Sequence, residues 1–108
     1  MSQEYLGEFE QMVMLTIMRL GEQAYGLAIR AELESVAGRR PSSGALYTTL
    51  DRLEKKGLLS SSAGDSSAER GGRPRRYVIL TPEGHTALAQ SRSTLMALWE
   101  GIEKALDR

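Results

Sequence analysis

Apolar side chains recur with helical spacing along residues 4–20, the first of four stretches that predict helices. The stripe consists of Leu6, Phe9, Val13, Ile17 and Leu20. Four further apolar residues make the second half of this helix apolar nearly all round: Met12, Met14, Leu15 and Met18. A helix of this kind is buried on all sides. Because one small domain covers only one face, we expect the other face to pack against a second subunit.

Two more helices are predicted over residues 25–37 and 43–56, joined by a short turn over residues 39–41. Ser42 or Ser43 caps the start of the second of these helices, because a serine oxygen accepts from the unpaired N–H groups there. Its apolar residues recur at i, i+4 and i+7 and form one buried stripe: Leu46, Leu50 and Leu53.

A hairpin and a last helix follow. Strands are predicted over residues 58–61 and 75–80, with a loop over residues 62–73 that is rich in Ser, Gly and charge. Thr81-Pro82-Glu83 then begins a helix that runs to about Leu106, since Thr caps, Pro fits the first helical position and Glu suits the positive end of the dipole. Its roughly 26 residues would span ~39 Å, longer than the small core beside it.

This last helix carries an apolar stripe that, from Leu95 onward, follows the alternating four- and three-residue steps of a coiled-coil seam, with Arg92 interrupting it before Leu95. Its members are Leu88, Leu95, Trp99, Ile102 and Leu106. Because the helix is longer than the domain, we expect the stripe to pack against a partner subunit rather than fold back on its own domain. Together with Phe9 and Met12 of the first helix, it forms the predicted homodimer interface.

Three helices followed by a hairpin is the element order of a winged helix-turn-helix. The predicted fold class is therefore mainly α with a small β-hairpin: a winged helix-turn-helix with an additional long C-terminal helix. We divide the chain into a DNA-binding domain over residues 1–81, whose first helix is shared with the dimer interface, and a dimerisation helix over residues 82–108.

The third predicted helix is the candidate recognition helix. Opposite its leucines lie residues that can approach base edges in the major groove of DNA. These are Gly44, Thr48, Asp51, Arg52 and Lys55, with Ser43 at the helix start. Tyr47 lies on the flank, where its hydroxyl can donate to a phosphate. Asp51 repels phosphate, so it has a place here only if it accepts from a cytosine amino group or orients Arg52 or Lys55.

The net charge of zero, from 14 basic and 14 acidic residues in 108, conceals a basic island. Residues 1–38 sum to −4, residues 39–76 to +5 and residues 77–108 to −1. The basic side chains flank the recognition helix and the hairpin, where duplex phosphates would pass. They are Arg39, Arg40, Lys55, Lys56, Arg70, Arg73, Arg75 and Arg76. We expect Arg73 and its neighbours to bind the DNA backbone or to enter the minor groove, whose negative potential favours arginine.

Other classes of function find little support. The chain has no Cys, which excludes disulfides and thiolate metal sites. There is no apolar run of about 18 residues, and the N-terminus does not resemble a signal peptide, so we expect a cytoplasmic protein without a membrane partner. His85 is the only His, and neither convergent ligands nor a nucleophile with a base accompany it. We predict no enzymatic activity, no metal and no cofactor.

Three stretches carry a resemblance to a known family: Tyr25-Gly26, GALYTTLDRLEKKGLL over residues 44–59, and GRPRRYVILTPEGHTAL over residues 72–88. In them the chain resembles the PadR family of bacterial transcriptional regulators, in the short subgroup with a single C-terminal helix. The resemblance implies a homodimer, held by the first and last helices, that binds a pseudo-palindromic operator in double-stranded DNA as a repressor. It also implies DNA contacts by Tyr47, its helix neighbours and Arg73.

In the multidrug-sensing branch of that family, a Trp on the last helix stacks with planar ligands between the subunits. Counted from Gly84, that position corresponds to Leu95 here, one turn before Trp99, so we assign Trp99 to the dimer core. Two alternatives stay open. One adds a small aromatic effector bound between the dimer helices. The other is a winged-helix module that docks its basic face on an acidic protein partner and does not bind DNA.

Overall fold

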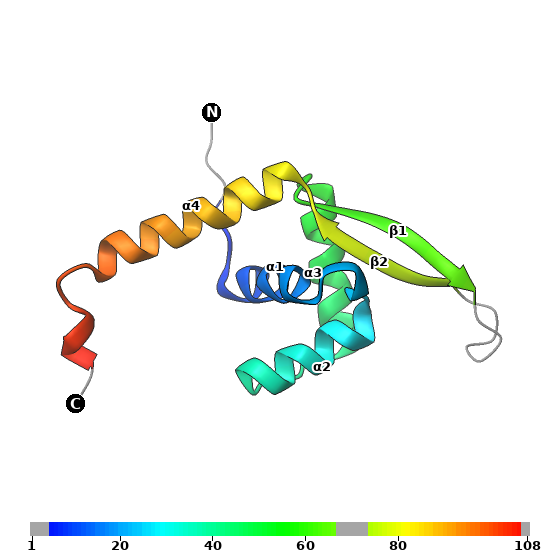
Figure 1. Ribbon diagram of the computed structural model, residues 1–108, viewed down its shortest axis with the longest axis horizontal. Coiled ribbons are helices and arrows are strands. Elements are labelled where there is room, and N and C mark those ends of the chain that lie inside the picture. Colours follow the sequence, from blue (N-terminus) through cyan, green and yellow to red (C-terminus); the bar gives the residue numbers. More distant parts are fainter. Residues whose placement is uncertain (1–4, 67–73, 107–108) are drawn as a thin grey trace.

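The computed structural model describes residues 5–66 and 74–106. In chain order the elements are α1 (Glu8–Leu20), the 3-10 turn η1 (Gly21–Gln23), α2 (Gly26–Ala37), α3 (Ser43–Lys55), β1 (Leu59–Ser66), β2 (Pro74–Leu80), α4 (Pro82–Trp99) and the 3-10 turn η3 (Glu103–Leu106). The first three helices form a central body, from which the hairpin extends to one side and α4 to the other (Figure 1). Three helices, a hairpin and an extra C-terminal helix confirm the predicted fold class.

The leucines of α3 form the centre of the hydrophobic core. Leu46, Leu50 and Leu53 are all buried, as their spacing predicts. The other elements surround them with further buried side chains, among them Val13, Met14, Ile17, Ile29, Leu33, Leu59, Val78, Leu80 and Leu88. Leu88, predicted at the dimer interface, therefore lies in the core of its own chain.

The hairpin pairs β1 with β2 in antiparallel register, with Leu59 opposite Leu80. β1 continues to Ser66, so the predicted loop over residues 62–73 is wrong over its first five residues. This Ser-rich stretch has no apolar alternation to mark it as a strand, and the backbone pairing with β2 extends it. The rest of the predicted loop, residues 67–73, lies outside the described ranges.

The last helix ends earlier than predicted. α4 stops at Trp99 instead of about Leu106, so it is about 27 Å long at 1.5 Å per residue. Glu100 leaves the helical region, and Gly101 has a φ of 85°, which favours glycine. The Gly101 N–H donates to a Glu103 carboxylate oxygen at 3.1 Å, and the chain then forms the separate turn η3. A local turn at glycine therefore outweighs the apolar spacing.

The carboxylate of Glu10 ties α1 to the C-terminal end of α3. One oxygen accepts from the Gly7 N–H at 2.9 Å, which caps α1 and explains why this helix begins at Glu8 and not at Glu4. The other lies 3.2 Å from Lys56 Nζ and 3.7 Å from Arg52 Nη1. Burial alone would raise the pKa of Glu10, but the hydrogen bond from Gly7 and the two cations outweigh it and lower the pKa.

Replacing Glu10 with Gln removes the charge that these cations neutralise. Because its pKa is lowered in the folded state, ionised Glu10 stabilises the fold above its ordinary pKa of 4.5, and this stabilisation is lost as the pH falls through the folded-state pKa. We expect Glu10→Gln to lower the free energy of unfolding by about 1–3 kcal/mol at neutral pH, and by much less in acid, in urea denaturation.

Glu8→Gln is the matched control, because it removes the same charge from the same turn of α1. The Glu8 side chain is 88 % exposed, so this variant should unfold like the wild type. Equal losses of stability in the two variants would contradict the role assigned to Glu10.

Candidate nucleic-acid interface

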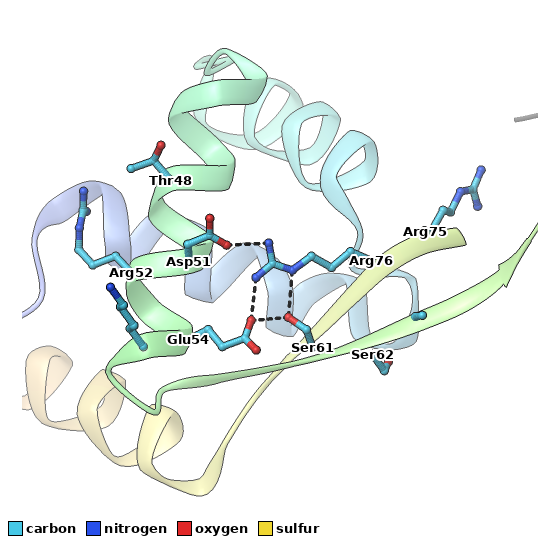
Figure 2. Close-up of a pocket in the computed structure, with 10 residues that line it drawn as sticks. Thr48, Asp51, Arg52, Glu54, Ser61, Ser62, Arg75 and Arg76 are labelled. Carbon is cyan, nitrogen blue, oxygen red and sulfur yellow. Dashed lines mark hydrogen bonds and ion pairs between the residues drawn. The ribbon is translucent and has the colours of Figure 1, made fainter. Parts of the chain in front are cut away.

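A groove of about 1020 Å³ separates the exposed face of α3 from the hairpin (Figure 2). α3 forms one wall, and β1 and β2 form the other. The lining is polar or charged at all but one position: Thr48, Asp51, Arg52, Glu54, Lys55, Ser61, Ser62, Ala63, Arg75 and Arg76. Residues far apart in the sequence thus form one charged concave surface.

The predicted recognition face lies on one side of α3. All of its predicted members are exposed: Ser43, Gly44, Thr48, Asp51, Arg52 and Lys55. The cap is Ser42 rather than Ser43, since the Ser42 hydroxyl oxygen accepts from the Ala45 N–H at 3.1 Å. Buried leucines on one side therefore leave a polar side that faces the groove and solvent.

Tyr47 is fixed on the flank of this face by a close contact with α2. It is 40 % exposed, and its hydroxyl lies against Gly26, the first residue of α2. A Cβ at position 26 would collide with that hydroxyl. The Tyr25-Gly26 pair noted in the sequence therefore has a structural reason, because glycine provides the space that Tyr47 occupies.

Arg39 and Arg40, predicted to meet phosphates, have acidic neighbours and do not line the groove. The Arg39 guanidinium lies 5.2 Å from the centre of the Phe9 ring and 3.8 Å from Glu8 on α1. Arg40 donates to Glu34 on α2 at 2.8 Å. Both arginines are exposed, and exposed ion pairs contribute little free energy.

Arg75 lies near the outer part of the hairpin, where aromatic rings hold β2 against the start of α2. Its guanidinium lies 4.1 Å from the centre of the Tyr25 ring, and that ring meets Tyr77 edge-on at 5.5 Å. The Val78 N–H donates to the Ala24 carbonyl oxygen at 3.0 Å, so the helical body pairs with this edge of β2. The predicted contacts Arg70 and Arg73 lie outside the described residues.

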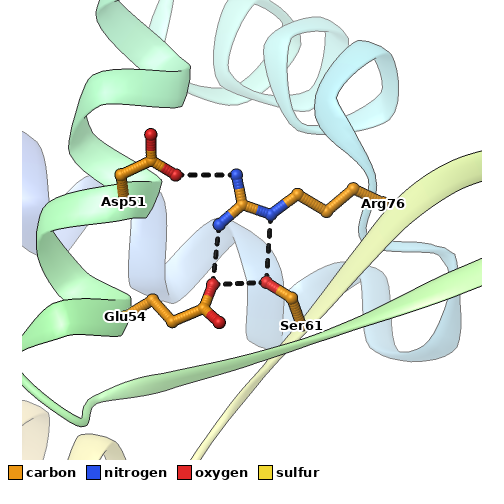
Figure 3. A network of polar contacts seen from close by, with 4 residues as sticks. All are labelled: Asp51, Glu54, Ser61 and Arg76. Carbon is orange, nitrogen blue, oxygen red and sulfur yellow. Dashed lines mark hydrogen bonds and ion pairs between the residues drawn. The ribbon is translucent and has the colours of Figure 1, made fainter.

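Arg76 joins three elements at the floor of the groove (Figure 3). Its Nη1 donates to Asp51 at 2.9 Å and its Nη2 to Glu54 at 2.7 Å, both on α3. Its Nε donates to the Ser61 hydroxyl of β1 at 3.0 Å, and that hydroxyl donates to Glu54 at 2.5 Å. We call Arg76, Asp51, Glu54 and Ser61 the Arg76 cluster.

The Arg76 cluster shifts the pKa of both of its principal partners. Hydrogen bonds from Ser61 and then Arg76 lower the pKa of Glu54. Burial would lower the pKa of Arg76, but the hydrogen bonds to Glu54 and Asp51 outweigh it and raise that pKa. Both shifts favour the charged states, so the ion pairs persist across the physiological pH range.

Glu54 and Ser61 were not among the residues predicted from the sequence, and Arg76 was counted only as one of the basic side chains. Two signals were present. Arg76 alternates with the buried Val78 and Leu80, which places it on the inner face of β2. Glu54 follows Asp51 by three residues, so both carboxylates share one side of α3.

A second surface, apolar in character, lies where α1 faces α4. A groove of about 710 Å³ there is lined by five large apolar side chains that are each at least 38 % exposed: Leu15, Met18, Leu95, Met96 and Trp99. Phe9 and Met12 are only partly buried and pack against the core. Ile102 and Leu106 are exposed beyond the end of α4, so the predicted seam is not continuous on one helix.

His85 is exposed at the edge of this apolar groove. Among residues 5–66 and 74–106, no group of three or more His, Asp or Glu side chains is arranged to hold a metal ion. No helix in the described part of the chain is long and apolar enough to cross a membrane.

Comparison with known proteins gives one family. The sequence profile of the Transcriptional regulator PadR-like family matches residues 14–90. Transcriptional regulator Rv3488 of Mycobacterium tuberculosis is 41 % identical over 76 residues, which span 70 % of this chain and 66 % of that protein, just under two thirds of its length.

Solved structures agree with the sequence match. A PadR family transcriptional regulator from Eggerthella lenta has a TM-score of 0.70 and 32 % identity, over 92 % of this chain and 86 % of that one. A PadR-like transcription factor from Bacteroides fragilis has a TM-score of 0.72 and 28 % identity, over 90 % and 88 %. These findings confirm the resemblance seen in the sequence: the chain belongs to the PadR-like family of transcriptional regulators.

Proposed function

We propose that this regulator is a sequence-specific repressor that binds a pseudo-palindromic DNA operator as a homodimer. The observation that carries the proposal is the groove between α3 and the hairpin, whose walls bring Arg52, Lys55 and Arg75 together. Cations gathered along a concave surface of this kind suit a duplex backbone.

In this proposal α3 enters the major groove. Thr48, Arg52 and Lys55 are exposed at i, i+4 and i+7 and so share one side of the helix, from which they reach base edges and phosphates. Arg75, with Arg70 and Arg73 from the segment between the strands, contacts the backbone or the minor groove. Two such units on a two-fold axis would meet half-sites about 10 bp apart.

Arg39 and Arg40 contribute to DNA binding by exchanging their carboxylate partners for phosphates. Their ion pairs with Glu8 and Glu34 are on the surface, where such pairs add little stability. A phosphate can therefore replace either carboxylate without loss to the fold. We assign both arginines to phosphates at the edge of the duplex.

A titration of labelled duplex from the protein's own promoter region, followed by fluorescence anisotropy at several salt concentrations, tests the proposal. We expect saturable binding. The logarithm of the association constant should fall linearly with the logarithm of the salt concentration. The absence of salt-dependent binding, together with binding to an acidic protein, would instead favour the winged-helix module for protein–protein contact.

Lys55→Ala gives the residue-level prediction. If Lys55 neutralises one phosphate, its loss should weaken binding several-fold on every sequence and reduce the salt slope by about 0.9. Lys104→Ala is the matched control, because it removes the same charge from η3, outside the groove. Equal slopes for Lys55→Ala and the wild type would rule out a phosphate contact at this position.

The proposed dimer uses the apolar groove between α1 and α4. Exposed apolar side chains from two helices form one continuous patch there, and such patches mark interaction sites. A second copy related by a two-fold axis would bring the same patch against itself. A small aromatic effector would bind in this groove between the subunits, beside Trp99.

Leu95→Glu tests the dimer interface. We expect wild-type sedimentation to give about twice the chain mass of 11.9 kDa, and Leu95→Glu to give a monomer, because burying a carboxylate in an apolar interface is costly. Leu27→Glu is the control, since Leu27 is 59 % exposed on α2 and does not line this groove. A wild-type monomer at micromolar concentration would overturn the dimer.

A further inference from the structure

We propose that the Arg76 cluster is a positioning clamp that sets the distance between the recognition helix α3 and the hairpin β1–β2, which we call the wing. Asp51 and Glu54 increase DNA affinity through this clamp although their charges repel phosphate. This inference rests on the proposed DNA-binding function. From the sequence, Asp51 was expected either to accept from a cytosine amino group or to orient Arg52 or Lys55. The clamp gives it a different role, because Asp51 accepts from Arg76.

The clamp uses all three nitrogens of one guanidinium. Nε, Nη1 and Nη2 of Arg76 each donate to a different side chain, and these acceptors lie on β1 and at two positions of α3. A planar guanidinium holds such a fork in one geometry, which a lysine ammonium cannot reproduce. The cluster therefore fixes both strands of the hairpin relative to α3.

The Arg76 cluster lies where fixing the hairpin relative to α3 determines the width of the groove. The hairpin leaves the body near Leu59 and Leu80 and extends outward from there (Figure 1). Arg76 and Ser61 lie on the hairpin between that base and its outer end, and Asp51 and Glu54 lie on α3, on the same wall of the groove as Thr48 (Figure 2). The Val78 N–H and the Tyr25 ring already hold β2 beside the start of α2. The cluster adds the contact with α3, and without it the hairpin can shift relative to α3 and change the width of the groove, so that binding would require ordering of the wing.

The charge of the cluster argues against a simple phosphate site. One cation and two carboxylates give a formal net charge of −1 in a surface that otherwise carries cations. The side chain of Asp51 is 69 % exposed and that of Glu54 is 41 % exposed, whereas that of Arg76 is only 30 % exposed. The two carboxylates are therefore not needed to neutralise a fully buried cation. Two exposed acids that both pair with Arg76 fit a positioning role.

The sign of the effect of Asp51→Ala and Glu54→Ala on DNA binding tests the clamp. If the acids only repel phosphate, each variant binds tighter than the wild type. The clamp predicts weaker binding, by roughly twofold to tenfold, with the salt slope unchanged because no phosphate contact is lost. Asp51→Asn keeps an oxygen that can accept from Arg76, and should recover affinity relative to Asp51→Ala.

Arg76→Lys separates the positioning role from the charge. It keeps the cation and loses the fork, so the clamp predicts affinity reduced to that of Glu54→Ala, whereas a phosphate cation would leave affinity near wild type. Glu32→Ala is the matched control: Glu32 pairs with Arg19 at 3.0 Å between α2 and α1, outside the groove, and its loss should not weaken binding.

Amide hydrogen exchange of β1 and β2 in the free protein tests the clamp without DNA. The clamp predicts faster exchange in Asp51→Ala and Glu54→Ala than in Glu32→Ala. Unchanged exchange, or tighter DNA binding by the acid variants, would overturn the clamp. Wild-type protein that binds no duplex, with exchange still accelerated in the variants, would instead refute the proposed function and retain the wing–helix constraint.

Discussion

The burial of three leucines along one side of α3 constrains the rest of the structure. With Leu46, Leu50 and Leu53 in the core, α3 cannot rotate about its axis, so its opposite side has to face solvent. Two charged contacts then act on the same helix. Glu10 holds its C-terminal end to α1, and the Arg76 cluster holds the hairpin against its outer side. A fixed helix and a fixed wing give the groove a defined width.

The structure changes the interpretation of the basic island at residues 39–76. A sum of charges treats every cation there as available to DNA. In the structure Arg39, Arg40, Arg52 and Arg76 all lie within ion-pair distance of a carboxylate. The exposed pairs are weak enough for phosphate to replace them, but the Arg76 contacts join three elements and act on geometry. The basic island therefore combines exposed cations that can meet the duplex with Lys56 and Arg76, which hold elements of the fold together.

The sequence predicted the parts of the fold that depend on local chemistry. α2 and α3 begin and end within one residue of the predicted ranges, because Gly38 and Ser42 favour a helix end and a helix start. The end of α4 was not predicted, because a single turn at Gly101 does not change the apolar pattern. The length of β1 was not predicted, because its Ser-rich part is held by backbone pairing and has no apolar alternation. The Arg76 cluster unites positions 51, 54, 61 and 76, and such contacts follow from tertiary packing rather than from sequence spacing.

In the proposed function, the groove between α3 and the hairpin reads a DNA sequence as part of a symmetric pair. Selection of bound molecules from random duplex DNA tests it most directly, because binding and specificity are measured together. We expect enrichment of an inverted repeat whose half-sites are separated by one helical turn, ~10 bp. A bound pool with the same sequence composition as the input would contradict it.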